Sequence, residues 1–172
     1  MSNEELKLYY QNKLNEINNI IFKKVEYDNG DRYEGEFKND LREGKGIYYY
    51  NDGDRYEGEY KNDIMEGKGI YYYLSGEKYD GDWKNDIREG KGTYYWNNGN
   101  KYVGDYKKDI REGKGILYYK NGNRYEGDFK GGTFDGNGIL FFNNGFFESS
   151  SASISANAFL RASVRILASE LA

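Results

Sequence analysis

Hydrophobic and polar positions alternate along the chain from residue 31 onward. In the first such segment, 31–38, one face holds three apolar or small residues: Tyr33, Gly35 and Phe37. Charged residues take the other face, and this period of two predicts a β-strand. A polar connection at 39–44 and a second apolar run at 46–50 follow. The Asn-Asp-Gly sequence at 51–53 then predicts a tight hairpin turn, because glycine adopts the positive φ angles that such turns require.

The same pattern recurs every twenty-three residues. Five complete units follow one another, at residues 31–53, 54–76, 77–99, 100–122 and 123–145. A half-unit at Val25–Gly30 precedes them. Six positions are identical in all five units, and in the first unit they are Tyr33, Gly35, Lys38, Gly44, Gly46 and Gly53. Such repetition is typical of arrays in which each unit contacts mainly its neighbours.

The short links within and between units determine how the strands pair. Parallel strands need a long crossover connection, so these links favour antiparallel pairing. We therefore expect a mainly β protein, a single elongated antiparallel meander sheet of five and a half 23-residue hairpin repeats over residues 25–147. The recurrent Gly-Lys-Gly triplets are expected to let the returning strand bend, so that the sheet coils and forms a groove.

Residues 1–24 have a helical pattern. Ser2 and Glu5 have the spacing of a capping box. Apolar residues then recur at helical spacing, at Leu6, Tyr10, Leu14, Ile17 and Ile21. We expect an N-terminal amphipathic helix that caps the array, either by folding back on the sheet or by pairing with a second copy of the chain, since a terminal unit would otherwise expose its aromatic face and an unpaired strand edge.

Residues 148–172 differ in composition from the repeats. A Ser/Ala-rich stretch predicts a flexible joint, and a C-terminal amphipathic helix is expected beyond it. The apolar stripe of this helix is Phe159, Leu160, Val164, Leu167 and Leu171. We interpret the helix as a lid on the sheet or as a contact with a second copy of the chain. Two alternatives stay open: the stripe imitates a partner's helix lying in the groove, or the tail is an added segment unrelated to the array.

Composition narrows the range of functions. Aromatic residues make up 18% of the chain, so a core must consist largely of rings. Histidine and cysteine are absent, which excludes disulfides, imidazole and thiolate metal ligands, and the commonest general base. The net charge is −4 and the two signs are interleaved, which argues against a nucleic-acid footprint. We expect a non-enzymatic protein that uses no cofactor and no metal.

Three motifs suggest chemistry, but each has a simpler explanation. The aspartates beside Gly30 and Gly53 lack the bidentate acid of a calcium loop, and turn formation accounts for them. The Gly-Lys-Gly at 44–46 precedes a strand, so no helix N-terminus is available to hold a phosphate. Carboxylate pairs such as Glu34 and Glu36 recur from unit to unit, as expected for a solvated ladder of charge pairs and not for a catalytic pair.

The recurring rings are the candidate binding site. We expect one sheet face to present a continuous lane of aromatic side chains that an apolar helix or peptide of a partner protein contacts, since aromatic anchors dominate interface energetics. Val103, which replaces an acid of the ladder, is included as an unusual position. The predicted partner-binding residues are Tyr33, Phe37, Tyr56, Tyr60, Tyr79, Trp83, Trp96, Tyr102, Val103, Tyr106, Tyr125 and Phe129.

The repeat YEGEFKNDLREGKGIYYYNDGDR closely resembles the membrane occupation and recognition nexus (MORN) repeat, through its Tyr-x-Gly, the ring two positions later and its Gly-x-Gly. The resemblance covers residues 25–145. It weakens in the fifth unit, where Asn, Asp, Arg and Lys are replaced by Gly131, Gly132, Phe134 and Asn137. It implies an elongated single-sheet array of β-hairpins that works as a scaffold, dimerisation or protein-docking module. Phospholipid binding is an alternative function for such repeats.

The sequence also supports expectations about the oligomeric state, the location and a second, similar class of repeat. We expect a homodimer through sheet ends or terminal helices. The N-terminus lacks a signal-peptide pattern and no stretch reaches the roughly eighteen apolar residues of a membrane span, which predicts a soluble cytoplasmic protein. The hairpins also resemble choline- or glycan-binding cell-wall repeats, which are richer in tryptophan; here Trp83 and Trp96 do not recur in their columns.

Overall fold

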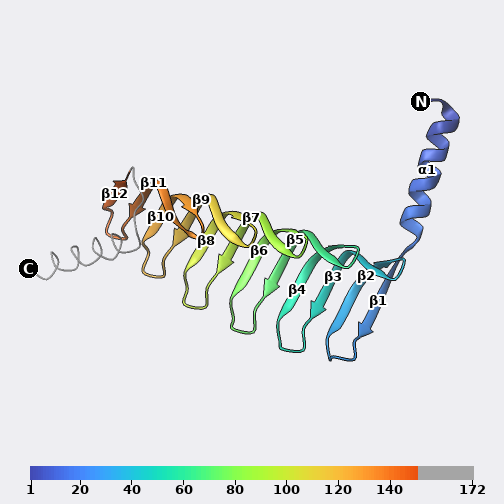
Figure 1. Cartoon of the computed structure of the whole chain (residues 1–172), viewed down its shortest axis with the longest axis horizontal. Coiled ribbons are helices and arrows are strands. Elements are labelled where there is room, and N and C mark those ends of the chain that lie inside the picture. Colours follow the sequence, from blue (N-terminus) through green and yellow to red (C-terminus); the bar gives the residue numbers. More distant parts are fainter. Residues whose placement is uncertain (151–172) are drawn as a thin grey trace, which may run out of the picture. The chain divides into compact units, whose positions relative to one another are not determined.

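The computed structural model describes residues 1–150, in which one helix precedes twelve strands (Figure 1). The elements are α1 (Asn3–Asn18), β1 (Ile20–Glu26), β2 (Arg32–Lys38), β3 (Leu41–Tyr49), β4 (Arg55–Lys61), β5 (Ile64–Tyr72), β6 (Lys78–Lys84), β7 (Ile87–Tyr95), β8 (Lys101–Lys107), β9 (Ile110–Tyr118), β10 (Arg124–Lys130), β11 (Thr133–Phe141) and β12 (Phe147–Ser150). Strand order follows chain order. The predicted mainly β fold, a single antiparallel meander sheet, is confirmed.

The described residues form two compact bodies. The first body comprises residues 1–74 and 83–86. The second body comprises residues 75–82 and, of the described residues, 87–150. Within each body, neighbouring strands pair antiparallel, and the register shifts by a β-bulge within the hairpins, at Gly35–Phe37 between β2 and β3 in the first body and at Gly104–Tyr106 between β8 and β9 in the second.

The chain changes from helix to strand close to residue 19. α1 begins at the predicted capping box, in which the Ser2 N–H donates to Glu5 Oε2 (2.6 Å) and the Glu5 N–H donates to Ser2 Oγ (3.2 Å). The predicted helix over 1–24 is corrected at its other end, because α1 stops at Asn18 and Ile21 lies in β1 opposite Phe37. Pairing of this β-branched segment with β2 overrides its helical periodicity.

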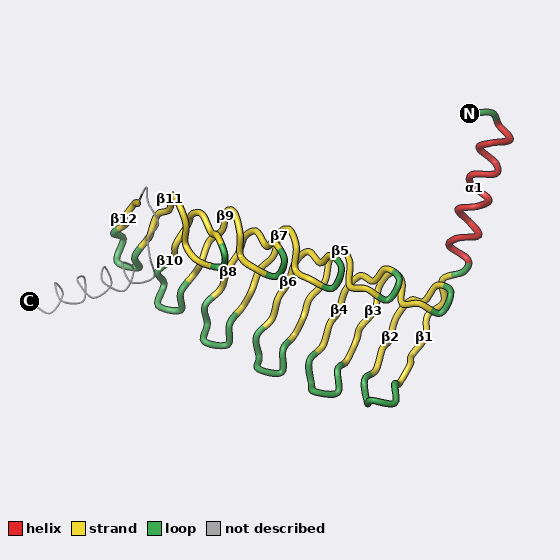
Figure 2. The backbone as a smooth tube through the Cα atoms, viewed as in Figure 1, coloured by secondary structure: helices red, strands yellow, loops and turns green. Residues whose placement is uncertain are grey.

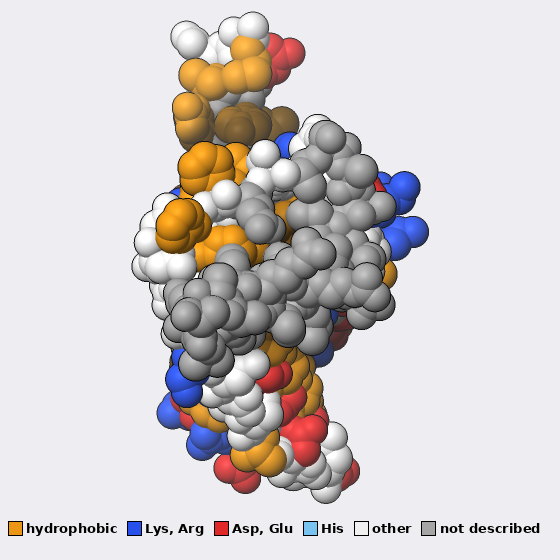
Figure 3. Space-filling view, turned by 90° about the vertical axis from the view of Figure 1, so that its left-hand side faces the viewer, with side chains coloured by type: hydrophobic (Ala, Val, Ile, Leu, Met, Phe, Trp, Pro, Cys, Tyr) orange, Lys and Arg blue, Asp and Glu red, His pale blue; other side chains and the backbone are white. Residues whose placement is uncertain are grey.

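The apolar stripe predicted for the N-terminal helix is exposed. Leu6, Tyr10 and Leu14 all lie at the surface, so α1 does not bury them against the sheet as a cap would. Hydrophobic side chains are visible along α1 at the top of Figure 3. The helix therefore does not fold back on the sheet as a lid, and its pairing with a second copy of the chain stays a prediction.

The array continues beyond its last complete unit. β12 pairs with β11, with Phe147 opposite Phe141 and Ser150 opposite Gly138. Residues 148–150, expected to begin a flexible joint, are therefore part of the sheet. The predicted C-terminal helix, with its stripe from Phe159 to Leu171, lies outside the described residues.

Two kinds of turn join the strands (Figure 2). Between β2 and β3 the chain reverses within two residues, Asn39 (φ 51°) and Asp40 (φ 61°), and both positions keep positive φ in every later unit. The predicted connection at 39–44 is thus a two-residue hairpin turn, and its other residues belong to β3. The turn predicted at 51–53 is confirmed, because Gly53 has φ 98° and its N–H donates to the Tyr50 carbonyl (3.1 Å).

One tyrosine per unit forms the centre of the core. Tyr33 is fully buried and lies across Gly35 and Gly46, which face each other on β2 and β3. A Cβ at either glycine would overlap this ring. The Tyr33 hydroxyl donates to the Glu36 carbonyl (3.2 Å). The corresponding tyrosines of the later units make the same hydrogen bond, and they are Tyr56, Tyr79, Tyr102 and Tyr125.

The two-residue turns also join one unit to the next. Asp63 Oδ1 accepts hydrogen bonds from the Arg42 backbone N–H (2.8 Å) and from Arg42 Nε (3.1 Å). Arg42 Nη2 in turn donates to the Asp63 carbonyl (2.8 Å). Asp109 and Arg88 repeat all three bonds in the second body. Each aspartate therefore fastens its own turn to the strand of the preceding unit.

Replacing Gly46 with alanine is expected to lower the free energy of unfolding by about 3 kcal/mol, because the added Cβ would displace the buried Tyr33 ring. Gly131→Asn is a matched control. No atom lies within 4 Å of a Cβ at Gly131, and the corresponding Asn39 already adopts the same left-handed conformation. The control is expected to cost less than about 0.5 kcal/mol. Urea unfolding compares the two variants, and equal costs would contradict the packing of the ring on glycine.

The contribution of the turn aspartates is measured by comparing Asp63→Ala with Asp40→Ala. Both residues have positive φ, so both variants carry the same backbone strain. Asp63 fastens Arg42, whereas the exposed Asp40 accepts from Lys23 Nζ (2.7 Å). We expect Asp63→Ala to cost about 1–2 kcal/mol more than Asp40→Ala. Thermal and urea unfolding test this, and a smaller cost at Asp63 would show that the bonds between units contribute little.

Candidate functional site

The predicted lane of rings is the hydrophobic core. Ten of its twelve residues are only 0–6% exposed, and they are Tyr33, Phe37, Tyr56, Tyr60, Tyr79, Trp83, Tyr102, Tyr106, Tyr125 and Phe129. Their rings meet edge to face, as Tyr33 and Phe37 do with centroids 5.1 Å apart. Within each body these side chains pack against one another, so they offer a partner little surface.

The other two predicted residues lie apart from each other. Trp96 is half-buried and packs on Tyr94, with centroids 4.9 Å apart. Val103 is 37% exposed and lies between Thr93 and Ile116 on the opposite sheet face. The structure therefore does not bring Val103 together with the rings.

A second set of rings on the core face is accessible. In the first body, five half-buried tyrosines follow one another, and we call them the tyrosine row: Tyr27, Tyr48, Tyr50, Tyr71 and Tyr73. Consecutive centroids are 5.8, 4.6, 5.7 and 4.6 Å apart. The sequence analysis missed this row. The signal that could have found it is the Tyr-Tyr-Tyr run, whose first and third rings share a face while the second points away.

The second body has a shorter version of this row. Tyr94 and Trp96 are in contact with their rings tilted by 51°, and Arg111 lies 5.6 Å from the centroid of Trp96. Tyr119 takes the next equivalent position, where burial raises its pKa to about 12. At the position after Tyr94 the column changes to Leu117, which is buried. The longest accessible aromatic surface within one body is therefore the tyrosine row.

Hydrogen bonds to acidic residues hold the row in place. The Tyr48 hydroxyl donates to Asp31 Oδ2 (2.7 Å), and the Tyr71 hydroxyl donates to Asp54 Oδ2 (2.9 Å). Asp31 is buried and also accepts from the Asn51 N–H (2.9 Å) and the Asn29 side-chain amide (2.8 Å). Donation from the Tyr48 hydroxyl, then from Asn51 and Asn29, lowers the pKa of Asp31. Burial and the bond to Asp31 raise the pKa of Tyr48.

Arg42 lies next to Tyr48 of the row and is held by Asp63. Its guanidinium carbon is 5.0 Å from the Tyr48 centroid and 5.1 Å from the Tyr60 centroid. Cation–π contacts of this kind are stabilising when the cation is partly desolvated. The fixed guanidinium therefore limits the positions that the Tyr48 ring can adopt.

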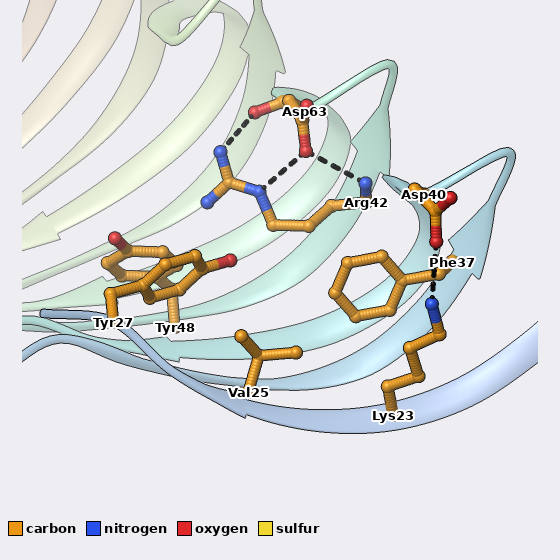
Figure 4. A pocket seen from close by; sticks show the side chains of 8 residues that line it. All are labelled: Lys23, Val25, Tyr27, Phe37, Asp40, Arg42, Tyr48 and Asp63. Carbon is orange, nitrogen blue, oxygen red and sulfur yellow. Dashed lines mark hydrogen bonds and ion pairs between the residues drawn. The ribbon is translucent and has the colours of Figure 1, made fainter.

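A pocket of about 430 Å³ lies beside the row, at its β1 end and within the first body. In Figure 4, Val25 lies between the rings of Tyr27 and Tyr48 on one side and Phe37 on the other. Two ion pairs complete the lining, Arg42 with Asp63 and Lys23 with Asp40. The bond to Lys23 lowers the pKa of Asp40. Rings and paired charges suit an apolar or aromatic group bound among satisfied polar neighbours.

The acidic ladder on the opposite face forms cross-strand pairs. Lys91 Nζ lies 2.5 Å from Asp105 Oδ1, and Lys114 Nζ lies 2.6 Å from Asp128 Oδ1. These partners are the lysines of the Gly-Lys-Gly triplets. Glu36 and Asp82 also accept backbone N–H bonds from Lys45 and Lys91 across the strand bulges. The carboxylates are therefore engaged in structural bonds, as a repeated charge ladder requires.

Residues 1–150 show neither a metal-binding cluster nor a membrane-spanning helix. They contain no group of three or more acidic side chains placed to hold a metal ion. Within the same residues, no helix has the length and hydropathy needed to cross a bilayer.

Comparisons with known proteins identify the repeat. The sequence model of the MORN repeat matches five consecutive segments, residues 33–55, 56–78, 79–101, 102–124 and 125–146. A search of curated proteins found no match.

Two solved structures share a distant likeness with the chain. The TCP domain of SAS-4 (dCPAP) from Drosophila melanogaster, solved with a proline-rich motif of Ana2 (dSTIL), is 18% identical, with a TM-score of 0.45; the match covers 75% of this chain and 83% of that one. The TCP10 domain of Danio rerio CPAP is 17% identical, with a TM-score of 0.28, and the match covers 76% and 74%. Both scores are low, so neither structure informs the function of this chain.

The bonds to Asp31 predict a pH dependence of stability. Its pKa in the folded chain lies below its ordinary value near 3.8, so Asp31 stabilises the fold above that value. The contribution is lost as the pH falls through the lowered pKa. Asp31→Asn is expected to be less stable than the wild type at neutral pH and to approach it at about pH 2. Urea unfolding at both pH values measures this, and a difference that is constant with pH would contradict it.

The source of the shift is tested separately with two hydroxyl deletions. Tyr48→Phe removes the hydrogen-bond donor that lowers the pKa of Asp31 most, so this pKa is expected to rise. NMR titration of the Asp31 carboxyl group measures the change. Tyr49→Phe is the control, because the Tyr49 ring lies on the other face, 4.1 Å from the Arg32 guanidinium. An equal shift in both variants would exclude the Tyr48 bond as the cause.

Proposed function

This chain belongs to the MORN repeat family, and from that premise we propose that it is a non-enzymatic protein-interaction scaffold. It binds a helix or peptide of a partner protein through the tyrosine row and the adjacent pocket. This assignment moves the binding surface from the buried rings predicted from the sequence to the half-buried rings beside them. The partner contacts the row, while the core rings beneath support it.

The observation that carries the proposal is the fixed, half-exposed state of the tyrosine row. Aromatic side chains give a large contact area at a low entropic cost, which is why they dominate interface hot spots. Tyr48 and Tyr71 are further restrained by hydrogen bonds to Asp31 and Asp54. Little side-chain conformational entropy is then lost when a partner binds.

The proposal of a non-enzymatic protein rests on how the carboxylates are used. Glu34 pairs with Lys24 (3.0 Å), and Glu36 accepts the Lys45 N–H (3.2 Å). Comparable bonds recur in other units, which supports a structural role. A catalytic pair of carboxyl groups requires one site where their environments differ.

Three finer points are part of the same proposal. The protein works in the cytoplasm, it forms a homodimer, and it binds protein in preference to phospholipid. Exposed apolar residues of α1, such as Leu6, Leu8 and Leu14, support self-association through the helix. The interleaved charges give no concentrated basic patch for anionic lipid.

Site-specific crosslinking in the source cell tests the proposed surface. A photo-crosslinking phenylalanine analogue is placed at Tyr50, in the row, or at Tyr49, its neighbour on the other face. We expect protein adducts from position 50 at about ten times the yield from position 49, since a contact-dependent reaction follows the bound surface. Equal yields would contradict the assignment of the surface. Flotation with phosphatidylserine vesicles is the second arm, and protein that floats with the vesicles would favour the phospholipid alternative.

A further inference from the structure

The contacts of Arg42 and Arg88 show how the array holds a guanidinium group. In the first body, Arg42 is bonded to the turn aspartate of the next unit, Asp63, and its guanidinium lies 5.0–5.7 Å from the centroids of three tyrosine rings. In the second body, Arg88 is bonded to Asp109 in the same way and lies 5.4–5.7 Å from three tyrosine rings. A carboxylate and a group of rings thus form a guanidinium site that the sequence repeats.

The interface between the second and third complete units has the aspartate without the arginine. Met65 lies one period after Arg42, and Asp86 lies one period after Asp63. The Met65 backbone N–H still donates to Asp86 Oδ1 (2.7 Å), and the Asp86 N–H donates to the Met65 carbonyl (3.2 Å). The methionine side chain, however, has no N–H group to donate to the carboxylate and no charge to neutralise it. Among the residues that the structure describes, Asp86 forms no ion pair.

Without an arginine beside it, the aspartate is accessible. Asp86 is exposed, whereas Asp63 and Asp109 are both half-buried next to their arginines. A carboxylate that accepts a backbone N–H on one oxygen can still accept charge-assisted hydrogen bonds. A guanidinium group suits this place, because its several N–H groups can bond a carboxylate and a carbonyl at the same time, as those of Arg42 do.

The exposed carboxylate adjoins the tyrosine row. Tyr71 of the row is half-buried, and its centroid lies 6.0 Å from that of Trp83, three residues before Asp86. Tyr71 corresponds to Tyr48, the ring of the row beside the guanidinium of the first unit. Burial raises the pKa of Tyr50, and the Asp86 carboxylate raises it further, against the effect of a neighbouring arginine. Asp86 is therefore close enough to act electrostatically on the row.

We propose that a basic segment of the partner protein places an arginine side chain between the Asp86 carboxylate and the ring of Tyr71. Its guanidinium takes the place that Arg42 and Arg88 take at their own interfaces. The carboxylate bonds the guanidinium, the rings contact its face, and Met65 packs on the apolar stem of the arginine. This inference rests on the proposed function, since the segment lies on the tyrosine row, and it adds that the segment is basic.

The probe for the test is a capped pentapeptide, Gly-Leu-Arg-Leu-Gly. It is titrated into the full-length chain, and the NMR signal of the Trp83 indole N–H is expected to shift and to saturate. The same peptide with citrulline in place of arginine has nearly the same shape without the charge, and it is expected to bind at least about fivefold more weakly. Trp96 is an internal reference. Arg111 already lies 5.6 Å from its centroid, so its indole signal is expected to stay unchanged.

A pair of aspartate variants tests the carboxylate. Asp86→Asn removes the charge but keeps an oxygen for the Met65 N–H, and asparagine tolerates the positive φ of this turn, as Asn62 shows. It is expected to weaken binding of the arginine peptide about fivefold or more, to the level of the citrulline peptide. Asp52→Asn removes one charge from an exposed turn that has Asn98 two units later, and it is expected to leave binding unchanged.

A second pair of variants supplies the guanidinium from within the chain. Met65→Arg restores the pattern of the first unit, so it is expected to raise the melting temperature and to weaken peptide binding about tenfold or more. Ile64→Arg adds the same charge on the opposite face of β5 and is expected to leave binding unchanged. Thermal unfolding establishes that all four variants are folded, and the asparagine pair decides the matter if an added arginine prevents folding.

Several results would overturn the proposal. They are the absence of a saturable shift, equal binding of the citrulline peptide, unchanged binding in Asp86→Asn, and an equal loss in Asp52→Asn, which would indicate general attraction between charges. A concentration-dependent dimer that Met65→Arg abolishes would also reject it, because the occupant would then be a second copy. Protein adducts at position 50 in the source cell that keep their yield in Met65→Arg would leave the scaffold function standing and reject only this inference.

Discussion

The packing of one tyrosine ring across two glycines is the constraint on which the fold depends. Among residues 1–150, no helix or second sheet packs over the strands, so no opposing layer from these residues fills the core. Here Tyr33 lies flat over Gly35 and Gly46 and is fully buried, with its hydroxyl bonded to the Glu36 carbonyl. Rings of neighbouring units then meet edge to face on this base. The glycines thus give a single layer the depth to bury a side chain.

Hydrogen bonds between adjacent units add to this stability, and each of them joins a unit only to the preceding one. Asp63 fastens Arg42 of the preceding unit, and Asp109 fastens Arg88. Where Met65 stands in the arginine column, its backbone N–H still bonds to Asp86 Oδ1 (2.7 Å). A main-chain bond survives the substitution, whereas the guanidinium contacts with the rings do not. The interfaces between units therefore share the main-chain bond and differ in their side-chain contacts, as expected for an array whose units stabilise their neighbours.

Much of this architecture could be predicted from the sequence, because the period fixes the strands, the glycine turns and the shared face of the rings. The terminal elements could not. Ile21 fits both the helical stripe and the strand, and only pairing with Phe37 selects the strand. Asn39 and Asp40 read as a polar connection, although both tolerate the left-handed conformation of a two-residue turn. The alternating pattern places Tyr33 and Tyr48 on the same face of the sheet. It does not show that Tyr33 is buried while Tyr48 stays half-buried.

The acceptor that fixes the end of each hairpin changes its chemistry along the chain. It is a carboxylate at Asp31 and Asp54 and an amide at Asn100 and Asn123, and in these four units it accepts the equivalent backbone N–H bond. Protons and salt act strongly on an ionised acceptor and weakly on a neutral one. Acid below the lowered pKa of Asp31 should accordingly loosen the hairpin that Asp31 closes, whereas the hairpins that end on Asn100 and Asn123 keep a neutral acceptor, so that similar units respond differently to protons.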